Sequence, residues 1–179
     1  MPIYRPEELD GVLARIREKA AGFDPVVEFG PVVPEETVRA FEEAHGVTLP
    51  EAYRRYLLEV GNGFEWEHGY PFLSFPPAEG TERLSAPFPF EEAWIWEAED
   101  GPPDPAKMAP VLDGSLELID IGCCQTAHLI VTGPCRGEVW WFCDVGIQPC
   151  CRRQDFLGWL EKWLDHGDNV NYFEDYPQE

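Results

Sequence analysis

The hydrophobic periodicity of the chain is helical in its first third and strand-like after residue 115, before a final helical segment, and this order limits the folds that the chain can adopt. Before residue 64, apolar side chains recur at helical spacing, as in Leu9, Leu13 and Ile16. After residue 115 they alternate with polar ones, as in residues 116–121, and turn residues follow every eight to ten positions. A block of helices followed by a block of strands is typical of α+β proteins rather than of alternating α/β proteins.

Four segments have the amphipathic pattern of helices. Their expected limits are residues 7–20, 34–45, 50–60 and 154–166. Proline opens the second and third segments, and glycine follows each of the four, as is common at helix starts and ends. Because only four residues separate the second segment from the third, these two are expected to form a helical hairpin.

Strands are predicted in the later part of the chain. Their expected limits are residues 116–121, 126–132, 138–144 and 145–150. Gly122 and the pair Gly133-Pro134 mark turns between them, and the last segment is expected at the edge of the sheet. Together with the helices, this meander predicts an α+β fold with an antiparallel sheet of about four to six strands and helices packed on it.

Residues 65–114 have a different composition. They carry eleven acidic and two basic side chains, a net charge of −9, and they are rich in proline, glycine and aromatic residues. We expect one or two short strands and a long surface loop here, with one or two helical turns in residues 91–98. The chain is predicted to be one domain, 1–179, with its core in residues 34–165 and an acidic, partly ordered tail at 168–179.

The charge of the chain limits its partners. The formal net charge is −21, from 34 acidic and 13 basic residues, so nucleic acid and anionic membranes are disfavoured and a basic protein is the natural partner. Solubility is the alternative reason for the charge, although −21 exceeds what solubility needs. No signal peptide is visible and the apolar runs are too short to span a bilayer, so a cytoplasmic location is expected.

Residues 91–104 are the candidate docking surface. Acidic side chains lie beside two tryptophans there, and interfaces favour aromatic anchors surrounded by polar groups. The candidate partner-binding residues are Glu91, Glu92, Trp94, Trp96, Glu97, Glu99 and Asp100. Two alternatives stay open: the carboxylates form a solvated face, and both tryptophans belong to the core.

Cysteines and histidines do not form a recognisable metal or catalytic motif. The cysteines are Cys123, Cys124, Cys135, Cys143, Cys150 and Cys151, and the histidines are His45, His68, His128 and His166. No C-x-x-C is present, so core packing is the expected role of the thiols, with a zinc site and redox chemistry as alternatives. His128 is expected as a core histidine rather than a catalytic base. No metal, cofactor or catalytic residue is predicted.

Two short stretches, residues 49–63 at the helical hairpin and 137–140 at a predicted strand, together form a recognisable motif. It consists of a Leu-Pro helix start, an aromatic position one turn later, a Gly-Asn-Gly turn and a Gly-x-Val-aromatic strand. Its residues are Leu49, Pro50, Tyr53, Gly61, Asn62, Gly63, Gly137 and Trp140. With this motif, residues 34–165 resemble the SUKH superfamily, which includes Smi/Knr-like cell-wall regulators and bacterial immunity proteins. One departure is Gly122-Cys123-Cys124-Gln125, where the superfamily usually has Gly-Asp at the sheet turn.

The resemblance implies an α+β fold and a binding role without catalysis. Bacterial members are commonly immunity proteins that neutralise a cognate toxin, often a nuclease, so the implied partner is a basic toxin domain. The alternative is a regulatory or scaffold module that has no toxin partner. For Gly61, Asn62 and Gly63 the implied role is structural, because a tight turn requires positive φ values. The oligomeric state stays open.

Overall fold

The chain has an α+β structure with one antiparallel sheet, which confirms the predicted fold class. The computed structural model describes residues 4–24, 26–64, 72–98, 101–150, 154–167 and 170–172. Its helices are α1 (Leu9–Gly22), α2 (Glu35–His45), α3 (Glu51–Glu59), α4 (Pro105–Met108) and α5 (Phe156–His166), with 3₁₀ turns at Pro6–Glu8 and Trp96–Ala98. Its strands are β1 (Trp94–Ile95), β2 (Ser115–Gly122), β3 (Gln125–Ile130), β4 (Val139–Cys143) and β5 (Gly146–Pro149). Within these ranges, no helix is both long and apolar enough to cross a membrane.

The four predicted helices are present as α1, α2, α3 and α5, and glycine is the C-cap of α2 and α5, whereas Gly22 is the last residue of α1 and Val60 caps α3. Gly46 follows α2 with a φ of 64°, a left-handed conformation in which glycine has no steric cost. The Asp155 carboxylate accepts a hydrogen bond from the Gly158 backbone N–H at 2.8 Å and so caps the start of α5. The short helix α4 was not predicted, because four residues contain too little periodicity to be recognised.

The five strands lie in the order β1-β5-β4-β3-β2. Strands β2 to β5 follow one another as the predicted meander, but β1 pairs with the outer side of β5, with Trp94 opposite Ile147. The prediction that residues 145–150 form an edge strand is therefore wrong. Only the 3₁₀ turn at Trp96–Ala98 remains of the helical turns expected in residues 91–98. A two-residue strand leaves no alternation in the sequence that could reveal it.

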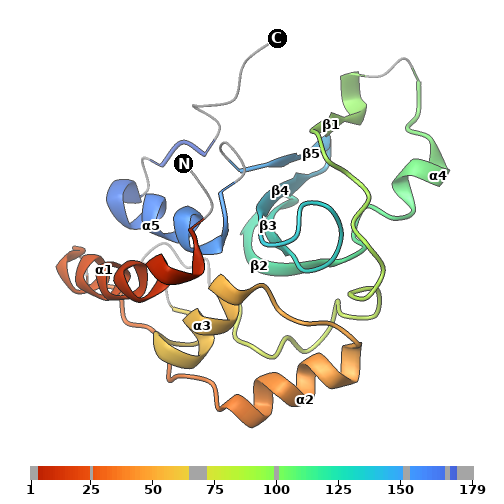
Figure 1. Cartoon of the computed structure of the whole chain (residues 1–179). Coiled ribbons are helices and arrows are strands. Elements are labelled where there is room, and N and C mark those ends of the chain that lie inside the picture. The colour runs from red at the N-terminus through yellow and green to blue at the C-terminus, as the bar shows by residue number, and fades with distance from the viewer. Residues whose placement is uncertain are drawn as a thin grey trace.

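Helices cover one face of the sheet. Figure 1 shows α1, α3 and α5 together on that side. Alternate residues of the two central strands, among them Ala127, Leu129 and Val139, are buried in the core that these helices share with the sheet. The aromatic rings of Phe64 and Trp163 stack in this core with their centroids 5.0 Å apart. Because burial stabilises by about 25 cal/mol per Å² of apolar surface, this layer is a main source of stability.

An irregular segment covers the opposite face. The intervening residues Ile130, Trp140 and Phe142 form a second core with Phe88 and other apolar residues of segment 88–98, to which residues 108–111 add two more. The Trp140 side chain is fully buried, and its ring centroid lies 4.8 Å from that of Phe88. In Figure 1 this segment runs along the side of the sheet that faces away from α1, α3 and α5. Both faces of the sheet are therefore apolar and covered over most of their area.

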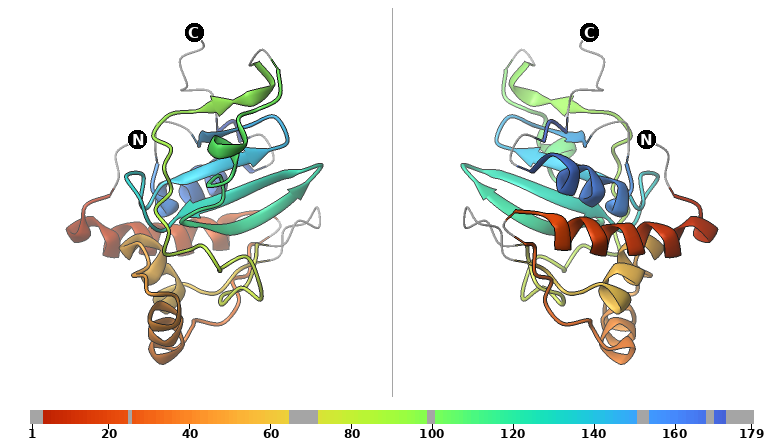
Figure 2. Two further views of the ribbon diagram at one scale, coloured as in Figure 1. Left: turned by 90° about the vertical axis from the view of Figure 1, so that its right-hand side faces the viewer. Right: turned by 90° about the vertical axis from the view of Figure 1, so that its left-hand side faces the viewer.

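A buried carboxylate joins α1 to α5, which lie side by side (Figure 2). Glu161 of α5 is 4% exposed and accepts hydrogen bonds from Arg15 Nε at 2.9 Å and from Tyr4 Oη at 2.5 Å. Lys19 Nζ lies 3.0 Å from the same carboxylate. Burial opposes ionisation of Glu161, but the hydrogen bonds outweigh it and lower the pKa of this carboxyl to about 2.

We expect Glu161→Gln to lower the free energy of unfolding by about 2 kcal/mol at pH 7, because it removes the charge that holds two cations. A pKa that is lower in the folded state stabilises the fold above the unfolded value of 4.5, and this contribution is lost as the pH falls from 4.5 through about 2. The difference between the two proteins should therefore shrink over that range in urea denaturation. Glu18→Gln, on the exposed side of α1, is the matched control and should change little. A difference that persists at pH 2 would show that the ionised network is not its source.

Candidate functional site

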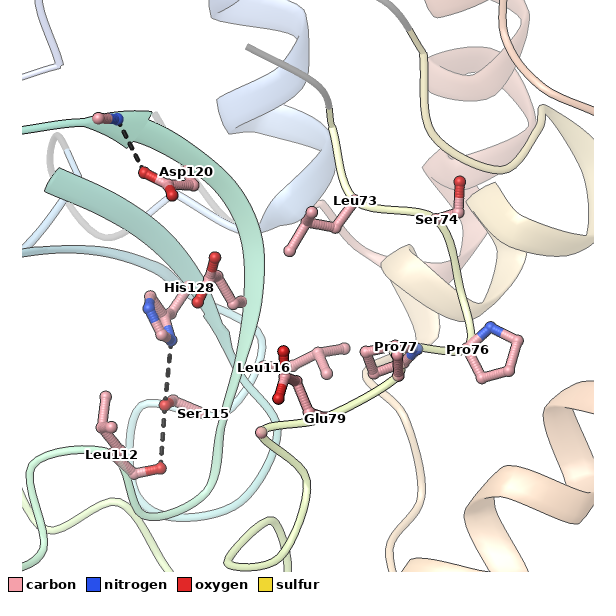
Figure 3. Close-up of a pocket in the computed structure, with 14 residues that line it drawn as sticks. Leu73, Ser74, Pro76, Pro77, Glu79, Leu112, Ser115, Leu116, Asp120 and His128 are labelled. Carbon is pink, nitrogen blue, oxygen red and sulfur yellow. Dashed lines mark hydrogen bonds between the residues drawn. The ribbon is translucent and has the colours of Figure 1, made fainter. Parts of the chain in front are cut away.

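A groove of about 810 Å³ opens between the segment 73–80 and strands β2 and β3 (Figure 3). Its volume lies within the range of roughly 300–1,000 Å³ that is typical of ligand sites. The lining residues are Leu73, Ser74, Pro76, Pro77, Ala78, Glu79, Gly80, Leu112, Ser115, Leu116, Glu117, Asp120, Gly122 and His128. The groove lies where the cover of the second face of the sheet ends, near β2.

Among the described residues that line it, the groove has acidic side chains and no lysine or arginine. Its lining includes the carboxylates of Glu79, Glu117 and Asp120. Burial, together with the charges of Asp120 and Glu79, raises the pKa of Glu117 above its usual value. Leu112, which is 58% exposed, adds apolar surface to the walls. The site therefore combines apolar surface with carboxylates that have no lysine or arginine beside them among the lining residues.

His128 forms part of the groove lining but is not placed for catalysis. Its ring is 6% exposed, stacks on Phe142 with a centroid distance of 4.1 Å, and has both nitrogens engaged. Ser115 Oγ lies 3.2 Å from Nδ1 and Thr126 Oγ1 lies 2.9 Å from Nε2. Burial lowers the pKa of His128 to about 3, so the imidazole is neutral at pH 7. The expectation of a satisfied, buried histidine is confirmed.

The hydroxyl of Ser115 bonds both to His128 and to the backbone of Leu112. Its hydroxyl donates to the carbonyl oxygen of Leu112 at 3.0 Å, which leaves the oxygen of Ser115 to accept from Nδ1–H of His128. Figure 3 shows this line of hydrogen bonds from His128 through Ser115 to Leu112. Thr126 then donates to the unprotonated Nε2. These hydrogen bonds hold β2, β3 and the exposed Leu112 in a fixed arrangement at the floor of the groove.

Asn62 attaches the other wall of the groove to the helical hairpin. Its side-chain nitrogen donates to the carbonyl oxygen of Phe75 at 2.7 Å, and its side-chain oxygen accepts from the Phe75 N–H at 2.6 Å. The backbone N–H of Leu73 donates to the carbonyl oxygen of Leu118 on β2 at 2.8 Å. Segment 72–75 is therefore held by Asn62 on one side and by the sheet on the other. We call the paired hydrogen bonds between Asn62 and Phe75 the Asn62 clamp.

Glycine is required on each side of Asn62 for a different structural reason. Gly63 has a φ of 67°, as expected for the tight turn. Gly61 does not have positive φ; a Cβ there would lie 2.5 Å from the Gly30 carbonyl oxygen, so the close approach of that strand-like segment excludes a side chain. Asn62 also lacks positive φ. The expectation of positive φ is thus confirmed for Gly63 and wrong for Gly61 and Asn62.

The remaining motif residues are structural. Leu49 and Tyr53 are buried in the larger core, and Pro50 directly precedes α3. Gly137 has a φ of 95° in the turn before β4. Trp140 donates its indole N–H to the Glu138 carboxylate at 3.0 Å. These positions hold the hairpin and the sheet in place, and none of them lines the groove.

The predicted docking residues lie at the opposite edge of the sheet from the groove. Glu91, Glu92 and Glu97 are exposed, but Trp94 is only 6% exposed and belongs to the second core. Trp96 is half-buried and donates its indole N–H to the Asp144 carbonyl oxygen at 2.7 Å. Glu99 and Asp100 lie outside the described residues, as do His68 and Cys151. The expectation that Trp94 is exposed is therefore wrong, because pairing of β1 with β5 turns its ring inward.

A cation already occupies part of that edge. Lys107 Nζ lies 4.0 Å from the centroid of the Trp94 ring, a cation–π distance. The groove has no such internal cation among its lining residues, so its carboxylates are the better candidate for a basic ligand. Sequence reasoning missed the groove because its acidic residues come from distant segments. The run Pro76-Pro77 followed by Glu79 was the one local signal of a rigid, acidic wall.

The cysteines divide into two groups. Cys135 and Cys150 are buried and Cys143 is partly buried, as core packing predicts. Cys123 and Cys124 are exposed at the turn between β2 and β3, so the packing prediction is wrong for these two. In the part of the chain that the structure describes, no three His, Cys, Asp or Glu side chains gather as a metal site.

We expect Glu117→Gln to raise the free energy of unfolding at pH 7. A carboxyl whose pKa is raised on folding destabilises the fold once it is ionised, so this cost grows as the pH rises above the unfolded value of 4.5. The gain in the variant should therefore disappear when urea denaturation is repeated below pH 4.5. Glu36→Gln, on the exposed side of α2, is the control. An unchanged stability of Glu117→Gln at pH 7 would contradict the assigned repulsion in the groove.

We expect Asn62→Ala to lower the free energy of unfolding by about 2 kcal/mol, since two hydrogen bonds to the backbone are lost. Amide hydrogen exchange at Phe75 should become faster, because its N–H loses its acceptor. Asn62→Asp keeps an acceptor for this N–H but loses the donor to the Phe75 carbonyl, so its effect on exchange should be smaller. Unaltered protection of the Phe75 amide in Asn62→Ala would show that the clamp does not hold the groove wall.

Comparison with known proteins gives one match. A sequence model described as the SMI1 / KNR4 family (SUKH-1) matches residues 33–155, which is more than half of the chain. This range contains the helical hairpin, the Asn62 clamp, both walls of the groove and the five strands. No curated protein and no solved structure matches the chain. The extent of the family match and the confirmed α+β fold show that the chain belongs to the SMI1 / KNR4 family (SUKH-1).

Proposed function

We propose that this SUKH-type chain is a non-catalytic immunity protein that neutralises a basic toxin domain in the cytoplasm. The observation that carries the proposal is the groove, in which Glu79, Glu117 and Asp120 face a shared space without a lysine or arginine among the lining residues. Membership of the SMI1 / KNR4 family (SUKH-1) supports a binding role, because the resemblance to the SUKH superfamily implies regulators or immunity proteins.

The groove is suited to a segment that bears arginine or lysine. A guanidinium can bind a carboxylate with two parallel hydrogen bonds, and a bound cation would relieve the repulsion that raises the pKa of Glu117. The aliphatic part of the same side chain can pack on the exposed Leu112. The net charge of −21 adds long-range attraction that accelerates encounter with a basic partner and disfavours nucleic acid as the ligand.

The acidic edge at Glu91, Glu92 and Glu97 is a second, weaker candidate contact. It lies near β1, at the other end of the strand order from β2. In the proposal it contributes to encounter through its charge, while the groove makes the close contact. The two surfaces can be tested separately, because no residue belongs to both.

The test is co-expression with the toxin encoded beside the gene of this chain, followed by binding kinetics of the purified pair. The groove variant combines Glu79→Gln, Glu117→Gln and Asp120→Asn, and we expect it to lose protection and to bind with an on-rate lower by about tenfold or more at low salt. The effect should shrink as salt is added.

The control variant changes the same number of charges on the helical side, with Glu18→Gln, Glu36→Gln and Glu51→Gln, and should still protect cells. Charge reversal of Glu91, Glu92 and Glu97 measures the second surface. If the groove variant protects as well as the control, the groove is not the binding site. If no toxin neighbours the gene and pulldowns recover several unrelated proteins with similar affinity, the chain is instead a regulatory module of the same family.

A further inference from the structure

The turn between β2 and β3 carries two consecutive cysteines in an unusual backbone conformation. Gly122 pairs with Gln125, and between them Cys123 and Cys124 have φ values of 51° and 61°. Two-residue hairpin turns of this kind need positive φ at both central positions, so Asn and Gly usually occupy them. The Cβ of cysteine disfavours this region, and each cysteine therefore costs free energy that Asn-Gly would avoid.

The fold gains no visible packing from these two thiols. Both side chains are exposed, and neither makes a hydrogen bond within the described ranges of the chain. Cys135 differs, because it is 2% exposed and its Sγ lies 3.4 Å from the Phe90 carbonyl oxygen. Packing thus explains the buried cysteines but not the pair at the turn. Residues held in sparsely populated backbone conformations cluster at functional sites.

The pair is poorly suited to a disulfide with itself. Consecutive Cα atoms lie about 3.8 Å apart, whereas disulfides usually join Cα atoms separated by roughly 4.4–6.8 Å. Closing this bond would add strain to a turn that is already strained. A larger atom inserted between the two sulfurs lengthens the ring and removes this restriction. The same spacing that disfavours the disulfide therefore keeps both thiols available to one bridging centre.

We propose that Cys123 and Cys124 form a dithiol site for a soft, thiophilic centre that takes two sulfur ligands. Soft thiolate ligands select soft centres over Mg²⁺ or Ca²⁺. A monosubstituted trivalent arsenical is the matching probe. When phenylarsine oxide reacts, two As–S bonds form, the two thiol protons leave with the arsenic-bound oxygen as one water, and no oxidation state changes. This site is independent of toxin binding in the groove.

The test is intact-mass spectrometry of the reduced full chain after treatment with phenylarsine oxide, with a monothiol added as competitor. We expect a phenylarsenic unit held by Cys123 and Cys124 and confirmed by peptide mapping. The second As–S bond is intramolecular, so it makes the adduct resistant to competition. In Cys123→Ser or Cys124→Ser, the monothiol concentration that removes the adduct should therefore be about 100-fold lower than in the wild type. Cys143→Ser, which removes a partly buried thiol elsewhere, should leave the competitor requirement unchanged.

A second variant separates the site from the stability of the turn. Cys123→Asn combined with Cys124→Gly supplies the residues that the turn prefers, so we expect a higher melting temperature together with loss of the monothiol-resistant adduct at this turn. Retention of wild-type monothiol resistance in either single serine variant would overturn the proposal. So would mapping of the resistant adduct to Cys150 and Cys151, the other consecutive pair in the chain.

Discussion

The sheet has two apolar faces, and the need to cover both of them shapes the rest of the molecule. Helices α1, α3 and α5 cover one face, and segments 88–98 and 108–111 cover most of the other. This second cover ends near β2 and β3. His128 marks the boundary, because its ring stacks on Phe142 in the core and also lines the open groove. The groove is thus a part of the sheet that the described residues leave uncovered.

The Gly61-Asn62-Gly63 turn at the end of the helical hairpin is bonded to one wall of this groove. Gly61 and Gly63 allow the backbone to pass close to Gly30 and to turn, and Asn62 between them holds Phe75. Through the Asn62 clamp, a motif that belongs to the helices positions a wall of the acidic site. Glu117 meanwhile keeps its carboxylate where burial and like charges oppose ionisation. Groups that cost stability in this way are common where binding needs them.

Expectations from the sequence succeeded where the signals are local. The four long helices were predicted from apolar spacing and from proline and glycine at their ends, and the meander from alternation and turn residues. Strand β1 was missed because two residues have no period. Trp94 was a candidate surface residue, because the sequence shows that a ring is present but not in which direction it points. The pairing of Trp94 with Ile147 directs this ring into the second core.

By itself, the sequence determined the α+β class, the order of the four long helices and the meander, the acidity and the family motif, because each of these follows from residue type and short-range spacing. Only the tertiary structure decided the site. Glu79 lies on the loop after the hairpin, Glu117 and Asp120 on β2, and His128 on β3. No local pattern links these positions. They share one groove because the sheet and the Asn62 clamp bring distant segments together, and contacts of that kind depend on packing rather than on spacing along the chain.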